Sequence, residues 1–151
     1  MNVEDRFEDY VNKLEQASKK NMGFFLIAMA DFPSGDKRML SYLEGYLDDT
    51  RITRVYIKPE YYAEVRYAAG AALASERAVQ GILEPVIIPA TVKLMKWGEM
   101  RDLALEARLD INLLPGELLP LLIEKNLVQK RNHIWFPRIP PRWLDEIRKQ
   151  D

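Results

Sequence analysis

The sequence contains no cysteine and only one histidine, His133, among its 151 residues. Zinc sites need several cysteine, histidine or carboxylate ligands that converge, and thiol catalysis needs a cysteine. A Ser-His-Asp triad would depend on His133, which sits in a basic polar stretch far from any nucleophile motif. Paired carboxylates such as Glu4 and Glu8 have no organising partner in the sequence. We therefore expect a protein that is not an enzyme and that holds no metal and no cofactor.

Long hydrophobic runs and an excess of one charge are absent as well. The longest apolar run, residues 23–30, is far shorter than the ~20 residues of a membrane-spanning helix. The first residues are acidic and precede no apolar segment, so we expect no secretory signal and a cytoplasmic protein. Lysine and arginine number 22 against 23 acidic residues, and the resulting net charge of -1 excludes a whole-molecule field that attracts nucleic acid. A local basic patch is compatible with this balance. The lack of cysteine and the 30% of charged residues also fit a thermophile.

What the chain does contain is the apolar patterning of a globular protein. Hydrophobic residues make up 48% of it, and its length fits one domain or two very small ones. Apolar residues recur at helical spacing in most segments, whereas residues 51–58 alternate as in a short strand. We therefore expect a mainly α fold with a small β component. A helical N-terminal part, residues 1–84, would pack on a C-terminal part, residues 85–151, and a single shared core is the alternative.

The boundaries of the expected elements follow from proline, glycine and capping residues. Residues 23–30 favour a buried helix, with a buried strand as the second choice. Pro59 fits the first turn of a helix rich in small residues, which we expect to be the central helix. The expected helices are 3–20, 23–30, 39–47, 59–83, 99–109, 114–125 and a last one from Pro140; a capped turn at 32–36 and a buried connector or edge strand at 85–89 complete the order.

The last third of the chain has the most distinctive pattern. Its order is helix, break, helix, asparagine cap, strand, polar turn and apolar strand, over residues 99–109, 110–112, 114–125, Asn126, 127–128, 129–133 and 134–136. Residues 93–137 thereby resemble the winged helix-turn-helix family. The residues that carry the resemblance are Leu103-Ala104, the Leu109/Ile111 turn, Leu118, Leu121, Leu122 and Asn126-Leu127-Val128.

The resemblance implies that the second helix of the motif lies in the major groove of DNA and that the wing touches the backbone. The wing would be the polar turn at 129–133, with a basic edge that continues toward the C-terminus. Its candidate nucleic-acid-binding residues are Lys130, Arg131, His133, Arg138 and Arg142. The alternative is that these charges only solvate a turn.

The helices of the motif, however, are acidic. Residues 99–124 carry six acidic side chains against Arg101 and Arg108, and the second helix offers no Arg, Asn or Gln in its first turns to read a base edge. Such a pair of helices repels phosphate and suits a basic protein surface. We therefore expect the helices to bind a protein partner through Glu99, Asp102, Glu106, Glu117 and Glu124.

A second candidate for nucleic-acid binding is the stretch between residues 51 and 67, where basic and aromatic residues interleave. Stacking on unpaired bases, combined with neutralisation of phosphates, needs this combination of side chains. Within the stretch, Arg66 and Tyr67 are the residues we single out. The alternative places the tyrosines in the core and the arginines in solvent. The members of the stretch are Arg51, Arg54, Tyr56, Lys58, Tyr61, Tyr62, Arg66 and Tyr67.

The turn from Ser34 to Arg38 leads into a helix and could hold an anion, but a plain capped turn is the favoured interpretation.

Together these patterns predict a non-enzymatic accessory subunit of a nucleic-acid-processing assembly, in replication, transcription or defence. It would bind the nucleic-acid backbone without sequence preference through the wing, and residues 3–20 could supply a homodimer contact. The alternative function is a pure protein–protein interaction or structural subunit.

Overall fold

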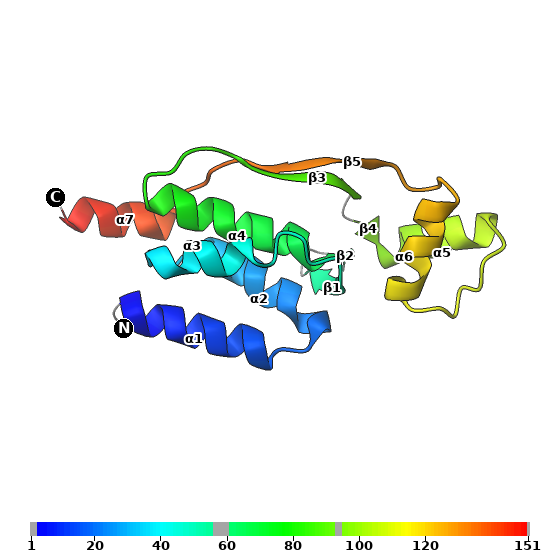
Figure 1. Cartoon of the computed structure of the whole chain (residues 1–151), viewed down its shortest axis with the longest axis horizontal. Helices are drawn as coiled ribbons and strands as arrows, with labels where there is room; N and C mark the ends of the chain where they lie inside the picture. Colours follow the sequence, from blue (N-terminus) through cyan, green and yellow to red (C-terminus); the bar gives the residue numbers. More distant parts are fainter. Residues whose placement is uncertain (1–2, 56–60, 93–94, 151) are drawn as a thin grey trace.

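The computed structural model describes residues 3–55, 61–92 and 95–150, and over these residues the fold is mainly helical with a small β component, as the sequence predicts. Figure 1 shows a layer of helices on one side and a smaller helical pair on the other, joined by a long two-stranded ribbon. The elements in chain order are α1 (Val3–Gln16), α2 (Lys19–Asp31), α3 (Lys37–Glu44), β1 (Ile52–Val55), β2 (Tyr61–Glu64), α4 (Val65–Val79), β3 (Val86–Val92), β4 (Met95–Lys96), α5 (Trp97–Glu106), α6 (Pro115–Glu124), β5 (Lys130–Trp135) and α7 (Pro141–Gln150).

Helix α4 is the centre of the larger part, because its small side chains let neighbours approach its backbone from several sides. Alanines and Gly70 are buried along most of its length. α2 and α3 pack on it, and β3 covers a further side. The core so formed also includes Leu14 of α1, Leu26 of α2 and Leu43 of α3, all at most 1% exposed. The expected central helix is therefore confirmed.

A second core joins the start of α4 to the small helical pair. Strands β1, β2 and β4 form an antiparallel sheet in that order, and the side chains behind it meet α5 and α6. Tyr67 is fully buried at this junction. Its partners in the cluster are Ala63, Met95, Met100, Leu119, Leu122 and Val128.

The ribbon of β3 and β5 ties the two parts together. Val86 pairs with Trp135 and Ile88 with His133, and these residues turn one face of the ribbon toward α4. Along the ribbon the chain returns from α6 to the larger helical layer, where α7 lies (Figure 1). There the indole N–H of Trp143 donates to the Pro33 carbonyl at 2.9 Å.

Two sequence-based expectations about the fold are wrong. The small-residue helix begins at Val65 and not at Pro59, because residues 61–64 form β2. The expected polar turn at 129–133 does not form, because residues 130–135 are one continuous strand paired with β3. Each core contains residues from both sides of position 84/85, since Val86 and Ile88 of β3 belong to the first and Tyr67 to the second. Residues 23–30 are helical as expected, although Phe24 is 44% exposed.

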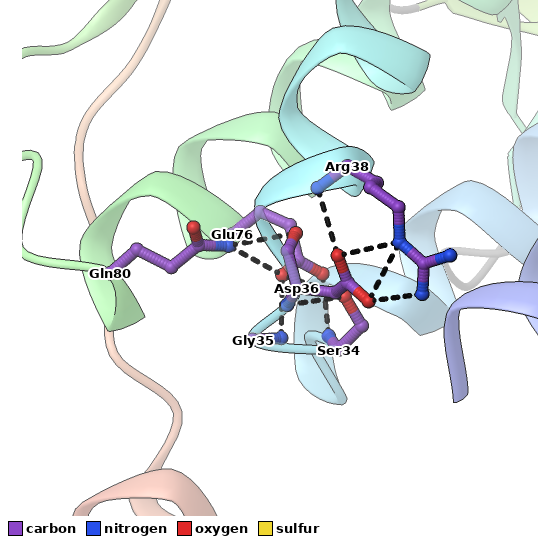
Figure 2. Close-up of polar contacts among 6 residues, drawn as sticks. All are labelled: Ser34, Gly35, Asp36, Arg38, Glu76 and Gln80. Atoms are coloured by element: carbon purple, nitrogen blue, oxygen red, sulfur yellow. Dashed lines mark hydrogen bonds and ion pairs between the residues drawn. The ribbon is translucent and has the colours of Figure 1, made fainter. Parts of the chain in front are cut away.

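A buried carboxylate fixes the turn between α2 and α3. Glu76 of α4 is 1% exposed, and its two oxygens accept from the Ser34 amide at 2.5 Å, the Gly35 amide at 2.8 Å and the Ser34 hydroxyl at 3.0 Å. Gln80 adds a longer contact of 3.4 Å (Figure 2). Burial raises the pKa of Glu76, and the donors around it oppose this rise. The anion that this turn holds is thus a side chain of the protein itself.

The same turn starts α3 through the cap that the sequence predicts. Asp36 accepts a hydrogen bond from the Arg38 amide at 2.9 Å and forms an ion pair with the Arg38 guanidinium at 2.6 Å (Figure 2). These bonds lower the pKa of Asp36. The guanidinium also lies 4.2 Å from the ring centroid of Phe7, so the cap is linked to α1.

Gly23 lets α2 lie directly against β1, and this contact predicts an unusual sign for a helix substitution. A Cβ at Gly23 would lie 2.6 Å from Thr53 Cγ2 and 2.8 Å from the Arg54 carbonyl oxygen. Gly23→Ala should therefore lower the free energy of unfolding by about 1–3 kcal/mol, the usual range for overpacking. Gly98→Ala is the control, because a Cβ there meets nothing within 4 Å. Alanine in that helix should leave stability unchanged or raise it by up to about 1 kcal/mol. Equal effects of the two substitutions in urea unfolding would contradict the packing.

Candidate nucleic-acid interface

A groove with a volume of about 490 Å³ is lined by residues of both parts of the molecule. Its walls come from four separate segments: the first turn of α2, the chain through β1, Tyr62 of β2 and the beginning of α6. Four cationic side chains line it, against one carboxylate. The cations are Lys19, Lys20, Arg51 and Arg54, and the acid is Glu117. We call this hollow the basic groove.

Contacts within the protein hold the cationic wall in place. Thr53 is buried, and its hydroxyl donates to the Lys20 carbonyl at 3.0 Å and accepts from the Gly23 amide at 2.8 Å. The start of α2 is thereby fixed against β1, and Lys19 and Lys20 reach the same groove as Arg51 and Arg54. Arg51 is itself fixed by Asp49, whose carboxylate lies 2.6 Å from the guanidinium. This ion pair raises the pKa of Arg51 and offsets part of its charge.

One aromatic side chain, Tyr62, lines the groove. Arg54 and Tyr62 are direct partners in the antiparallel pair of β1 and β2, so their side chains lie next to each other on one face of the sheet. Tyr62 also makes an edge-to-face contact with Trp97, with ring centroids 5.9 Å apart. An aromatic ring held in this way next to a guanidinium is a feature of sites that bind both bases and phosphates.

Two helices begin at this groove, and their orientation adds to its positive potential. Lys19 and Lys20 are the first residues of α2, and Leu114, Pro115 and Gly116 start α6. The N-terminal end of a helix carries a partial positive charge that favours anions. At α6 the Glu117 carboxylate accepts a hydrogen bond from the Leu114 amide at 3.1 Å, so the one acid of the groove is bonded to the first turn of this helix.

The residues of the basic edge that the winged-helix resemblance implies lie on β5, on the segment after it and on α7. Lys130 lies in β5, and Arg131 is exposed on the same strand. Arg138 instead forms an ion pair with Asp31 at 2.8 Å, and the guanidinium of Arg142 lies 4.6 Å from the ring centroid of Phe32. These contacts tie Arg138 and Arg142 to the end of α2. The polar turn expected for the wing is absent, whereas a role of these residues in nucleic-acid binding stays a prediction.

Arg66 and Tyr67, the two residues of the interleaved stretch singled out above, do not line the basic groove. Tyr67 is 0% exposed and belongs to the second core, so its ring cannot stack on a base. Arg66 forms an ion pair with the buried carboxylate of Glu64. Of the other members, Arg51, Arg54 and Tyr62 line the basic groove, whereas Tyr56 and Lys58 lie outside the described residues.

His133 is part of the interior and not of a basic surface. It is half-buried, and its ring makes edge contacts with Tyr67 and Trp135, each with centroids 4.8 Å apart. Among the described residues its Nε2 atom has no hydrogen-bond partner. Burial, and to a smaller extent the charge of Arg131, lower the pKa of His133. The folded protein therefore favours the neutral imidazole.

This position predicts a loss of stability in mild acid. Because the pKa of His133 is lower in the folded than in the unfolded chain, the unfolded chain takes up this proton first. The contribution is fully present above the unfolded-state pKa of about 6.5 and declines as pH falls through that value. His133→Phe keeps a ring between Tyr67 and Trp135 and should flatten the dependence between about pH 7.5 and 5.5. Parallel curves of unfolding free energy against pH for the two proteins would show that His133 is not the titrating group.

The five acidic residues expected to bind a partner are all exposed, but they do not all share one surface. Glu99, Asp102 and Glu106 follow one another at helical spacing on α5 and form an acidic stripe. Glu117 caps α6 and lines the basic groove instead. Glu124 lies near the end of α6, beside a separate open hollow that it shares with Asn126 and Gln129. Only the α5 stripe therefore remains as the acidic face.

Sequence reasoning missed Lys19 and Lys20, because it extended one helix over residues 3–20. The chain instead ends α1 at Gln16 and starts α2 at Lys19 after Ser18, and this break turns the two lysines toward β1. A serine immediately before the lysines is a helix-start signal, and it was the one clue in the sequence.

Within the described part of the chain, no helix has the length and apolar character needed to cross a bilayer. The same residues contain no group of three or more histidine or acidic side chains placed to hold a metal ion. No model of a known protein family matches the sequence, and the searches of curated proteins and of solved structures give no significant match. The resemblance of residues 93–137 to the winged helix-turn-helix family stays a prediction.

Proposed function

We propose that this protein is a nucleic-acid-binding subunit that holds the phosphate backbone in the basic groove. The observation that carries the proposal is the convergence of four cationic side chains on one hollow in a protein whose net charge is -1. Lys19 and Lys20 are exposed and extend from the first turn of α2, where they can meet phosphates. Attraction of phosphate by such a local cluster does not depend on the charge of the whole molecule.

Nucleic acid fits this groove better than a small inorganic anion. Its wall combines several cations with a tyrosine and the apolar side chains of Ile52 and Leu114, the latter 67% exposed. Nucleotides present a charged backbone together with flat apolar bases, so they match both kinds of surface. A small inorganic anion would use the cations alone.

The acidic stripe of α5 supports a second contact, with a basic protein partner. Three carboxylates at helical spacing, all exposed, repel nucleic acid and complement a cationic protein surface. This face lies on the smaller helical pair. The protein would then act as an accessory subunit, joining a nucleic acid and a protein of a larger assembly. A pure protein-interaction role through the stripe is the second candidate function.

The proposal is tested by fluorescence anisotropy of a labelled oligonucleotide at low salt. The triple variant K19Q/K20Q/R54Q removes three cations of the groove and should lose most of the affinity, because each phosphate contact contributes separately. The control is K37Q/K125Q/R101Q, which removes the same residue types from exposed positions outside the groove. Circular dichroism checks that both variants fold.

Equal loss of affinity in the two triple variants would mean that binding depends on total charge and would overturn the groove as the site. Absence of binding by the unmodified protein at low salt would overturn the nucleic-acid function. In that case the acidic stripe of α5 becomes the leading candidate, and the protein is best described as a protein-interaction subunit.

A further inference from the structure

We infer that the basic groove takes a single-stranded segment of nucleic acid, with an unpaired base stacked on Tyr62. The inference rests on the proposed function and specifies its ligand. It is carried by the placement of one tyrosine among the cations of the groove, together with the size of the hollow.

The size of the groove suits a single nucleotide better than the body of a double helix. A volume of about 490 Å³ lies within the range of pockets that hold one small ligand. A duplex presents a convex surface, and its bases are stacked and paired inside it. The Tyr62 ring in the groove is therefore accessible to a nucleotide that has left the double helix or was never paired.

Tyr62 is positioned to receive such a base. Its ring lies on the groove face of the sheet beside Arg54, and its contact with Trp97 fixes the ring from the side. A ring that is already held loses little further freedom when a base stacks on it. Arg54, Lys19 and Lys20 also line the groove, where they can contact the phosphates next to that base.

Two polar side chains of the groove wall, Thr53 and Glu117, make hydrogen bonds within the protein, so we expect base identity to have little influence on affinity. The Thr53 hydroxyl already donates to Lys20 and accepts from Gly23. One oxygen of the Glu117 carboxylate accepts from the Leu114 amide, which holds this side chain at the start of α6. Reading a base requires hydrogen-bonding groups that face the ligand, whereas stacking accepts any base. We therefore expect similar affinities for strands of different sequence.

The test compares one labelled strand of mixed sequence, alone and annealed to its complement, with the unmodified protein and with Tyr62 variants. The single strand should bind more tightly than the duplex. Tyr62→Leu removes the aromatic face and should weaken single-strand binding about tenfold, within the range measured for loss of one stacked base. Tyr62→Phe should retain the affinity. Tyr46→Leu is the matched control, because Tyr46 packs on Tyr42 and does not line the groove.

Each result decides one part of the proposal. Duplex binding as tight as single-strand binding, or unchanged single-strand affinity of a folded Tyr62→Leu variant, would overturn this inference and leave the proposed function standing. No binding of either form would overturn the proposed function itself. Loss of affinity in Tyr62→Phe as well as Tyr62→Leu would show that the hydroxyl and not the ring face is needed, and would also overturn stacking.

Discussion

Replacement of Glu76 by alanine is expected to lower the free energy of unfolding by about 3 kcal/mol or more, the largest stability effect we predict for a single residue. The carboxylate is 1% exposed and accepts from two amides, one hydroxyl and one side-chain amide. Removal leaves these donors facing a cavity, and each unsatisfied buried donor costs about 1–3 kcal/mol before relaxation. The turn it fixes also supports α3 and the Trp143 contact of α7.

Glutamine at position 76 should have an intermediate effect. Its carbonyl oxygen can replace Oε1, which accepts from Gly35 and the Ser34 hydroxyl, but its NH₂ group would then face the Ser34 amide. Two donors would oppose each other at a distance suited to a hydrogen bond, at a cost of about 1–3 kcal/mol. Loss of the buried charge offsets part of this cost, because burial raises the pKa of Glu76.

Glu44→Ala is the matched control for this prediction. Glu44 also binds a residue of α4, Arg77, but through an ion pair of 3.3 Å in which its side chain is 52% exposed. Exposed pairs contribute less than about 1 kcal/mol, so this variant should unfold nearly as the unmodified protein does. Urea unfolding measures all three variants, and hydrogen exchange should show loss of protection at the Ser34 and Gly35 amides in Glu76→Ala. A Glu76→Ala protein as stable as Glu44→Ala would contradict the structural role of the cluster.

The second large effect concerns the salt dependence of nucleic-acid binding. Each phosphate neutralised on a single strand contributes about -0.7 to the slope of log affinity against log salt. Loss of Lys19, Lys20 and Arg54 should therefore make the slope shallower by about 2 and lower affinity near 0.1 M salt by about two orders of magnitude. The K37Q/K125Q/R101Q control should keep the slope. A triple groove variant with unchanged slope but lower affinity would mean that these residues act through the fold and not on phosphates.

The local part of the fold was predictable from the sequence, because it depends on periodicity and caps. The small residues of α4, the Asp36 cap of α3 and the positive φ of Asn126 after α6 follow directly from residue type. In contrast, β5 could not be predicted. Its polar residues 130–133 are locally typical of a turn. They form a strand because β3, far away in the sequence, supplies hydrogen bonds to them.

The site was harder to predict than the fold for the same reason. The interleaved stretch includes Arg51, Arg54 and Tyr62. Because the sequence predicts a helix from Pro59, it does not predict that Tyr62 pairs with Arg54 in a sheet. The turn at Ser34 was recognised as able to hold an anion. That the anion is Glu76, more than forty residues away, depends on how α4 packs and not on any local motif.

The most direct test of the basic groove as the nucleic-acid site is photocrosslinking of a single strand that carries a photoreactive base analogue, followed by mass spectrometry of the crosslinked peptides. The account predicts crosslinks on Tyr62 and on the peptides that contain residues 50–54 and 114–117, with loss of these crosslinks in K19Q/K20Q/R54Q. Crosslinks confined to residues 130–142, which include β5 and the arginines after it, would place the strand elsewhere and contradict the groove.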